Sequence, residues 1–349
     1  MTDVDHAVAN ARAAYNDGRW SGLSVDTRKE VLQTLAKLLE SHTEEFALNE
    51  CLDVGKPISM ALKEDVPDSV AIIQQSAEGA DKLLSPFGST AMPLTYHIRK
   101  PVGVVGGIVG WNYPLVLAVT KMAPALAMGN SLVLKPSEFT SLSACRLAEL
   151  AVEAGVPPGV FNVVHGAGET VGVALSLHKD VDLLSFTGSS ETGKQLMIAA
   201  GQSNMKRLIL ECGGKSPYLV FDDAPNDLDF IASDIVSRAF ANQGALCIAS
   251  TRLLIQENIK KPLLEKILKR VASIVAQDPL DPDTSFGALM NEAHLKKVLS
   301  YIESGVEEGA QLIYGGQATE DISGGYYLGP TIFDGVDPLQ KIAQEEIFG

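Results

Sequence analysis

The sequence predicts an α/β protein in which parallel β-sheet is covered by helices on both faces. Beyond residue 101, short apolar runs alternate with segments of helical periodicity, and this alternation is typical of βαβ units. The chain has 349 residues, of which 46% are hydrophobic, and it contains no internal repeat or low-complexity segment. That length is enough for two domains, each with a core of its own.

The composition limits the kinds of binding partner and the cellular compartment that we expect for this protein. The net charge is −15, whereas a nucleic-acid-binding surface is basic. The four cysteines (Cys51, Cys145, Cys212 and Cys247) form no C-x-x-C pair and have no histidine at ligand spacing, which fits a reducing compartment. The amino terminus lacks the features of an export signal, and polar residues interrupt the longest apolar run. We therefore predict a cytoplasmic protein with no metal and with no nucleic-acid or membrane partner.

The first eighty residues are predicted to form helices that cover a sheet. Apolar residues at helical spacing predict a helix over 3–17, and Thr27 with Glu30 has the pattern of a capping box that opens a second helix. Gly55 and Pro57 end a third helix, and a further helix over 59–82 bends or restarts near Pro67. Residues 90–101 are rich in β formers and read as a strand that leaves this helical layer.

The remaining elements follow in alternation. Strands are predicted over 104–109, 131–135, 160–164, 183–186, 208–211, 217–221 and 252–256. Helices are predicted over 114–128, 140–154, 168–177, 191–200, 227–241, 259–276 and 291–308.

A candidate nucleophile lies in the segment 240–252. Cys247 follows a turn that contains Gly244, and backbone N–H groups in such a loop can stabilise a thiolate or a developing oxyanion. The alternative is a buried structural cysteine, because cysteine is among the most buried residue types.

Two further loops follow predicted strands of the sheet. Asn112, in Gly110–Pro114, carries a side-chain amide that suits an oxyanion, although the same segment could be a proline turn with a packed Trp111. Lys135 and Glu138 come just after a strand and could hold ribose hydroxyls, or they could be a solvated helix start.

Two later loops complete the set. Gly188 and Ser189 stand at a helix N-terminus, which suits a pyrophosphate, although the motif by itself favours an ordinary helix cap. Glu211 ends an apolar run before Gly213 and Gly214, so we expect it to be buried with a raised pKa, as a general base. The alternative is a glycine-rich turn between two strands.

The ordered set of motifs resembles that of the NAD(P)-dependent aldehyde dehydrogenase superfamily, and the resemblance covers nearly the whole chain. It rests on Gly-Trp-Asn-Tyr-Pro (110–114), Lys-Pro-Ser-Glu (135–138), Phe-Thr-Gly-Ser (186–189), Glu-Cys-Gly-Gly-Lys-Ser-Pro (211–217) and the Cys247 loop. Residues 203–207 and 252–255 look most like the bacterial gamma-glutamyl-gamma-aminobutyraldehyde dehydrogenases.

The resemblance implies oxidation of an aldehyde, for example an aminoaldehyde, to a carboxylic acid. In that reading Cys247 is the nucleophile, Glu211 activates the hydrolytic water, and Asn112 with the Cys247 N–H forms the oxyanion hole. Lys121 matches a lysine near the family's active site, and Ala245 stands where the family usually has glutamine.

The resemblance also implies a bound nicotinamide cofactor. Lys135 and Glu138 would hold the adenosine ribose, and Glu346 and Phe348 the nicotinamide ribose and ring. The pyrophosphate would be lined by Trp111, Gly188, Ser189 and Gly193. We expect NAD in preference to NADP, because the Glu138 carboxylate would repel a 2′-phosphate.

The family's organisation implies three parts. Residues 1–83 and 104–214 would form the NAD-binding domain, 84–103 part of a β-strand oligomerisation arm, and 215–349 the catalytic domain. Family members extend beyond both ends of the chain, so it is expected to be a fragment of an enzyme that forms homodimers or homotetramers. Two alternatives stay open: a CoA-acylating aldehyde dehydrogenase, and a non-catalytic NAD-binding or structural protein.

Overall fold

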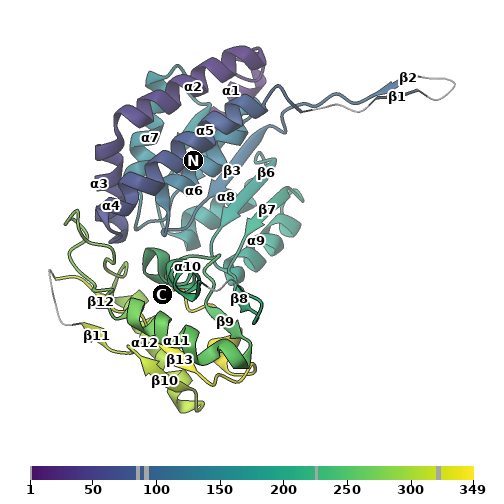
Figure 1. Ribbon diagram of the computed structural model, residues 1–349. Helices are drawn as coiled ribbons and strands as arrows, with labels where there is room; N and C mark the ends of the chain where they lie inside the picture. Colours follow the sequence, from purple (N-terminus) through teal and green to yellow (C-terminus); the bar gives the residue numbers. More distant parts are fainter. Residues whose placement is uncertain (1, 84–86, 90–93, 225–226, 320–323) are drawn as a thin grey trace. The chain divides into compact units, whose positions relative to one another are not determined.

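A computed structural model describes residues 2–83, 87–89, 94–224, 227–319 and 324–349 (Figure 1). The chain divides into two compact units. The first unit consists of Met1–Glu50 and Leu62–Cys212, and the second of Cys51–Ala61 and Gly213–Gly349. Residues 51–61, which the sequence analysis placed with the first domain, therefore pack with the second unit.

The first unit is built on a five-stranded parallel sheet with the strand order β5-β4-β3-β6-β7. The strands are β3 (Val104–Ile108), β4 (Ser131–Lys135), β5 (Phe161–Val163), β6 (Leu183–Thr187) and β7 (Arg207–Glu211). All four strand pairings are parallel, as the sequence predicts. Because the chain adds strands first on one side of β3 and then on the other, the sheet has a switch point between β3 and β6, where α/β proteins bind ligands.

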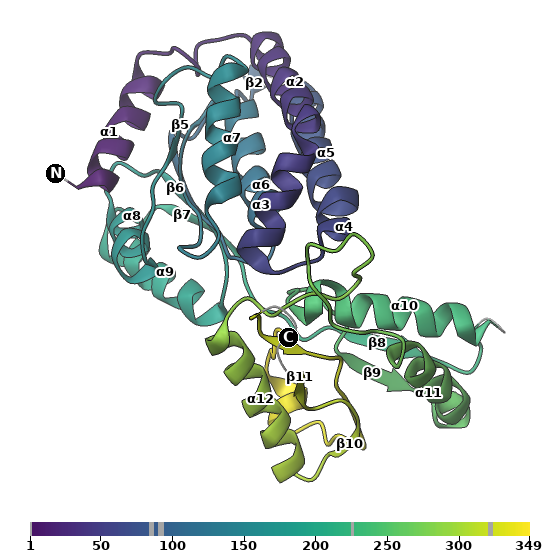
Figure 2. The ribbon, with the colours of Figure 1, turned by 90° about the vertical axis from the view of Figure 1, so that its left-hand side faces the viewer.

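Helices cover both faces of this sheet (Figure 2). On one face, α1 (Asp3–Asn16), α8 (Val173–Leu177) and α9 (Ser190–Gln202) share an apolar core with β3, β4 and β6. The other face is covered by helices that include α6 (Pro114–Ala127) and α7 (Leu142–Glu153). Gly106 and Gly107 of β3 point to opposite faces: a side chain at Gly106 would meet Leu184, and one at Gly107 would meet Leu134. These glycines let both helical layers approach the central strand closely.

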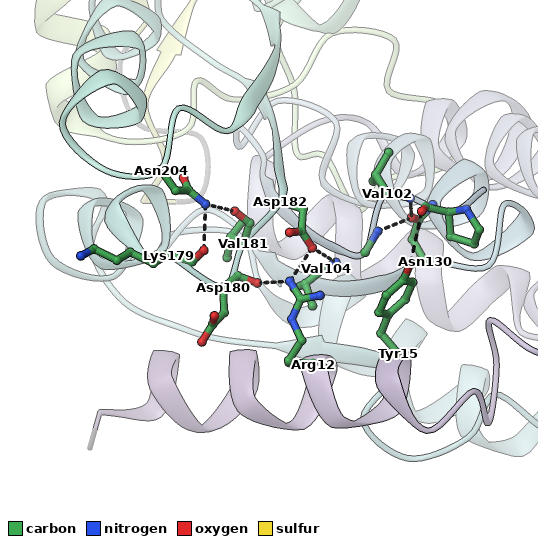
Figure 3. A network of polar contacts seen from close by, with 12 residues as sticks. Arg12, Tyr15, Val102, Val104, Asn130, Lys179, Asp180, Val181, Asp182 and Asn204 are labelled. Atoms are coloured by element: carbon green, nitrogen blue, oxygen red, sulfur yellow. Dashed lines mark hydrogen bonds and ion pairs between the residues drawn. The ribbon is translucent and has the colours of Figure 1, made fainter. Parts of the chain in front are cut away.

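A polar network ties α1 to the amino end of the sheet (Figure 3). The Asp182 carboxylate accepts a 2.8 Å hydrogen bond from the Val104 N–H and pairs with the Arg12 guanidinium. Arg12 also donates to the Asp180 carbonyl at 2.7 Å. A side chain at Gly103, which has φ +127°, would strike the same carboxylate. This end of the sheet is consequently structural, and the opposite end is left for the candidate site.

The remaining helices of the first half show where the sequence predictions needed correction. The helices are α2 (Val25–Ser41), α3 (Thr43–Val54), α4 (Ile58–Met60), η1 (Ala61–Asp65, a π-helical turn) and α5 (Val66–Gly79). The capping box predicted at Thr27 was wrong: α2 begins one turn earlier, and Ser24 caps it by accepting from the Thr27 N–H at 3.1 Å. The break predicted near Pro67 is confirmed, because the π-helical turn ends there and Pro67 stands in the first turn of α5.

The segment predicted as a strand over 90–101 is divided in the structure. Residues 90–93 lie outside the described residues, and β1 (Phe87–Ser89) pairs antiparallel with β2 (Leu94–Tyr96). Residues 97–101 are not in a strand. The assignment of 84–103 to an oligomerisation arm stays a prediction.

The second unit has smaller sheets. β8 (Pro217–Val220) pairs parallel with β9 (Arg252–Ile255), and α10 (Leu228–Phe240) and α11 (Glu257–Val271) pack over them around Val220, Ile231 and Leu263. The other elements are η3 (Ala241–Gly244), α12 (Glu292–Glu307), β10 (Gln311–Tyr314), β11 (Ala318–Thr319), β12 (Tyr327–Leu328), β13 (Ile332–Asp334) and α13 (Lys341–Gln344). The helix predicted over 259–276 ends at Val271, and the one predicted over 168–177 is split into η2 (Gly168–Gly172) and α8. Within the described residues, none of the helices combines the length and apolarity that crossing a membrane requires.

Candidate active site

Three neighbouring strands of the first unit bring predicted site residues together at their carboxyl ends. Thr187 of β6 pairs with Glu211 of β7, and the Gly188 N–H donates to the Glu211 carbonyl at 3.0 Å. On the other side, a Cβ at Gly110 would lie 3.6 Å from both the Asn112 Oδ1 and the Thr187 carbonyl oxygen. Asn112, Gly188 and Glu211 therefore lie at one edge of the sheet, at its switch point.

Asn112 is buried and lies just before a helix. This helix, α6, begins two residues later with Pro114, whose fixed φ suits the first helical position. The backbone N–H of Leu115 donates to Glu50 Oε1 at 3.1 Å, so a buried carboxylate from α3 caps α6. Sequence reasoning missed Glu50, which lies in α3, far along the chain from the loop that it supports.

Lys121 lies two turns into α6, with its side chain over β3. Its Cβ is 3.6 Å from the position that a Cβ at Gly107 would take, and the residue is buried. Burial lowers the pKa of Lys121, and the negative charge of Glu211 opposes that shift. Lys121 and Glu211 are thus close enough for their charges to interact.

The burial of Glu211 differs from the sequence prediction. The sequence predicts a buried carboxyl group, but Glu211 is exposed. The prediction was wrong because β7 is an edge strand of the five-stranded sheet, and its residues alternate between exposed and half-buried positions. An exposed carboxylate remains accessible to water, which is the reactant that a hydrolytic base must reach.

Lys135 and Glu138 form one polar pair after β4. The buried Lys135 ammonium donates to the Pro136 carbonyl at 2.9 Å and to Glu138 Oε2 at 3.3 Å. Burial by itself would raise the pKa of Glu138, but backbone N–H groups, including that of Gly168, and the Lys135 charge together lower it. Glu138 is exposed and ionised at neutral pH, so its oxygens can accept hydrogen bonds from the hydroxyls of a ribose.

The loop before α9 is occupied largely by its own contacts. The Ser189 hydroxyl accepts from the Thr192 N–H at 3.2 Å, so Ser189 is the helix cap that the alternative reading described. The Gly188 N–H is used within the sheet, as described above. A side chain at Gly193 would lie 2.8 Å from the Cys212 sulfur, so only glycine lets α9 approach the end of β7.

In the second unit, Cys247 follows a left-handed turn. Asn242, Gln243 and Gly244 have φ of 48°, 56° and 81°, which is unusual for the two residues that are not glycine. The Gln243 side chain stabilises this conformation by donating to the Ala288 carbonyl at 3.0 Å. The turn predicted from Gly244 is present, and it is tighter than the sequence indicated.

The Gly213–Gly214 turn contacts two other segments of the second unit. A Cβ at Gly214 would lie 2.6 Å from the Cys247 carbonyl oxygen, and one at Gly213 would lie 2.3 Å from Glu346 Oε2. The Gly214 N–H donates to Glu346 Oε1 at 3.1 Å. This turn therefore brings Cys247 and Glu346 to the same place.

The segment 345–349 is anchored at two more points. The Phe348 carbonyl lies 2.6 Å from His294 Nε2, which must carry the hydrogen because a carbonyl only accepts. The Tyr301 hydroxyl donates to Glu345 Oε2 at 2.8 Å, and burial and this carboxylate raise the pKa of Tyr301 to about 12. Sequence reasoning did not find His294 or Tyr301, since neither stands in a recognisable motif.

The predicted residues thus fall into two groups. The first unit contains Asn112, Gly188 and Glu211 at the edge of the sheet, together with Trp111, Lys121, Gly193 and the Lys135–Glu138 pair. The second unit contains Cys247, Glu346 and Phe348. No group of three or more histidine, cysteine, aspartate or glutamate side chains suited to a metal ion occurs in the described parts of either unit.

Comparison with known proteins identifies one family along the whole chain. A model described as "Aldehyde dehydrogenase family" matches residues 1–349. The chain is 47% identical over 348 residues to the Escherichia coli NADP/NAD-dependent aldehyde dehydrogenase PuuC, with 99% of the chain and 69% of that protein covered.

Solved structures agree with this match. The Pseudomonas syringae indole-3-acetaldehyde dehydrogenase AldA, solved with NAD+ and IAA, superposes with a TM-score of 0.98 at 48% identity, covering 99% of this chain and 70% of that one. A gamma-glutamyl-gamma-aminobutyraldehyde dehydrogenase from Burkholderia cenocepacia has a TM-score of 0.97 at 46% identity, covering 100% and 70%. The α/β fold with its parallel central sheet is the fold of these enzymes.

Proposed function

This chain belongs to the aldehyde dehydrogenase family and is an NAD(P)-dependent aldehyde dehydrogenase, and we propose that Cys247 and Glu211 perform the two halves of its reaction. The reaction oxidises an aldehyde to a carboxylic acid. It needs a nucleophile that holds the substrate, a donor for the oxyanion and a base for water.

In the first half, the Cys247 thiolate attacks the aldehyde carbon and forms a C–S bond. The carbonyl oxygen becomes an oxyanion, which the Asn112 side-chain amide and the Cys247 backbone N–H stabilise. A bound nicotinamide cofactor supplies the hydride acceptor. When the carbon loses its hydride and the C=O bond reforms, the substrate remains as a thioester on Cys247.

In the second half, Glu211 takes a proton from a water molecule whose oxygen attacks the thioester carbon. The C–S bond breaks, the Cys247 thiolate leaves and the carboxylic acid is released. Lys121 is the buried cation whose charge interacts with that of Glu211.

The observation that carries this proposal is the contact of Gly214 with the Cys247 carbonyl. Glu211 precedes Gly214 by three residues, so the chain keeps their Cα atoms within about 11 Å of each other. The covalent connection therefore limits how far the Cα atom of Glu211 can lie from the segment that contacts Cys247.

The residues present fit a dinucleotide. The ionised Glu138 next to Lys135 suits an adenosine ribose, and the Glu346 carboxylate suits the second ribose. Trp111 follows β3 and Gly188 and Ser189 follow β6, so these residues, with Gly193 of α9, would line the pyrophosphate. Phe348 would contact the nicotinamide ring. NAD is the preferred form, because Glu138 repels a 2′-phosphate.

The substrate proposed is an aminoaldehyde, which is supported by the similarity to the gamma-glutamyl-gamma-aminobutyraldehyde dehydrogenase. A homodimeric or homotetrameric assembly and a cytoplasmic location are also proposed. A CoA-acylating reaction is the second candidate, and Glu211 favours hydrolysis over it, because a carboxylate activates water while a thiol cofactor does not require a base of this kind.

The test is NADH formation from a small aldehyde, measured with and without CoA. Cys247→Ser should abolish turnover while binding of NAD survives, because a serine hydroxyl without a partner base stays protonated at neutral pH. Cys145→Ser, which changes an exposed thiol on α7, is the matched control and should retain activity. Turnover in Cys247→Ser would refute the assignment, and turnover that depends on CoA would favour the second candidate.

A further inference from the structure

We propose that the carboxylate of Glu346 is a positioning group that holds the Gly213–Gly214 turn against the main chain of Cys247. This role differs from holding the cofactor, because it concerns contacts within the protein chain. It rests on the proposed function only in the assignment of Cys247 as the nucleophile.

The first step is the contact between Glu346 and the turn. Glu346 Oε1 accepts from the Gly214 N–H at 3.1 Å, and its second oxygen fills the space where Gly213 would carry a Cβ. Glu346 is half-buried and the hydrogen bond itself lies at an exposed position, and a carboxylate acceptor makes this bond stronger than one to a neutral acceptor.

The second step is the contact between the turn and Cys247. A Cβ at Gly214 would come within 2.6 Å of the Cys247 carbonyl oxygen, so the two main chains pack directly against each other. Neither Gly213 nor Gly214 has the positive φ that favours glycine. Close approach to the main chain of Cys247 therefore requires glycine at 214, whereas a side chain at Gly213 would displace the Glu346 carboxylate. Through these two contacts the turn transmits the position of the carboxylate to the nucleophile loop.

The third step is the charge around the carboxylate. Burial and the nearby Arg252 lower the pKa of Lys215 to about 8, while Glu346 and Glu345 oppose that shift. Positive and negative groups thus gather at the turn. The adjacent Glu345 is directed elsewhere, to the Tyr301 hydroxyl, which makes it a control of equal charge.

Bracing the turn is compatible with a contact to a cofactor. A carboxylate offers about four acceptor positions, and the Gly214 N–H uses one of them. Glu346 could therefore hold the turn and still accept from ribose hydroxyls.

The experiment measures hydrogen–deuterium exchange of the backbone amides of residues 241–252 in the cofactor-free protein. Glu346→Ala should accelerate exchange in this peptide about tenfold, because a hydrogen bond to a charged acceptor resists local opening. Glu346→Gln retains an oxygen acceptor and should restore most of the protection. Glu345→Gln should leave the peptide unchanged.

A double-mutant cycle identifies the pathway. Gly213→Ala should raise exchange as Glu346→Ala does, because its methyl group displaces the carboxylate, and it should add little in the Glu346→Ala background. Exchange in α12 (292–307) should stay at the original rate in every variant, which separates a local brace from general loss of stability.

The inference is overturned if Glu346→Ala leaves 241–252 unchanged, if Glu345→Gln has the same effect, or if the effects of Gly213→Ala and Glu346→Ala add in full. These outcomes leave the proposed function intact. Turnover by Cys247→Ser would instead refute the proposed function and would leave the exchange result standing.

Discussion

The carboxylate of Glu50 and the backbone N–H of Leu115 lie 3.1 Å apart, although 65 residues separate them in the chain. Glu50 is fully buried and also accepts from the Ser143 hydroxyl at 2.5 Å. It joins α3, α6 and α7 at the point where α6 begins, two residues after Asn112. A carboxylate at a helix N-terminus is stabilised by the helix dipole and by the N–H groups there.

Replacing Glu50 should therefore weaken the first unit. We expect Glu50→Ala to lower the free energy of unfolding by about 2–4 kcal/mol, because buried donors lose their acceptor and a cavity remains. Urea unfolding followed by Trp20 fluorescence checks this, since Trp20 is buried and donates to the Leu126 carbonyl of α6 at 2.9 Å. Glu50→Gln keeps an acceptor and should lose less; equal losses in both variants would show that the hydrogen bonds matter little.

The role of Glu211 can be read from the time course of NADH formation. Glu211→Gln should give a burst of about one NADH per site and then a slow steady state, because the base is needed mainly for the water step. Rapid-mixing absorbance measures both phases. Glu191→Gln, which changes an exposed carboxylate on α9, should behave like the unmodified chain. Loss of the burst together with the steady state would place Glu211 in thiol activation or in structure instead.

Cofactor choice should depend on Glu138. We expect kcat/KM to be higher with NAD than with NADP, and Glu138→Gln should narrow that ratio roughly tenfold because it removes the repulsion of a 2′-phosphate. Initial rates at low cofactor concentration measure the ratio. Lys135 cannot simply compensate, since its ammonium is already held by the Pro136 carbonyl and by Glu138. Similar rates with both cofactors before the mutation would contradict the assignment.

Lys215 should make stability depend on alkaline pH. Its pKa is lowered by burial from 10.5 to about 8 in the folded chain, so between these values the unfolded chain binds more protons than the folded one. The free energy of unfolding should consequently rise with pH from 8 to about 10.5, relative to Lys215→Met, which has no charge to bury. Urea unfolding at several pH values measures the difference between the two proteins.

Lys215→Arg supplies the control for that experiment. Arginine stays protonated across this range, so its stability relative to Lys215→Met should not change with pH. If the difference in free energy of unfolding between the unmodified chain and Lys215→Met does not change with pH, Lys215 titrates normally in the folded chain.

The sequence by itself determined the succession of strands and helices. The runs 131–135 and 104–109 show no alternation of apolar and polar residues, which is typical of a strand buried on both faces, and the structure confirms both as β4 and β3. The family could also be identified from the sequence, because its loops carry characteristic motifs in a fixed order along the chain. That order can be recognised without knowing where the loops lie in space.

Tertiary structure alone decided which groups meet. Glu211 was expected to be buried because it ends an apolar run, yet its exposure depends on β7 being the last strand of the described sheet, which is a property of strand order. Two other sets of contacts join segments that are far apart in the chain. Glu50 accepts a hydrogen bond from the start of α6, and the Gly213–Gly214 turn contacts both Glu346 and Cys247. Periodicity and turn chemistry act over a few neighbouring residues, whereas these contacts depend on how whole elements pack.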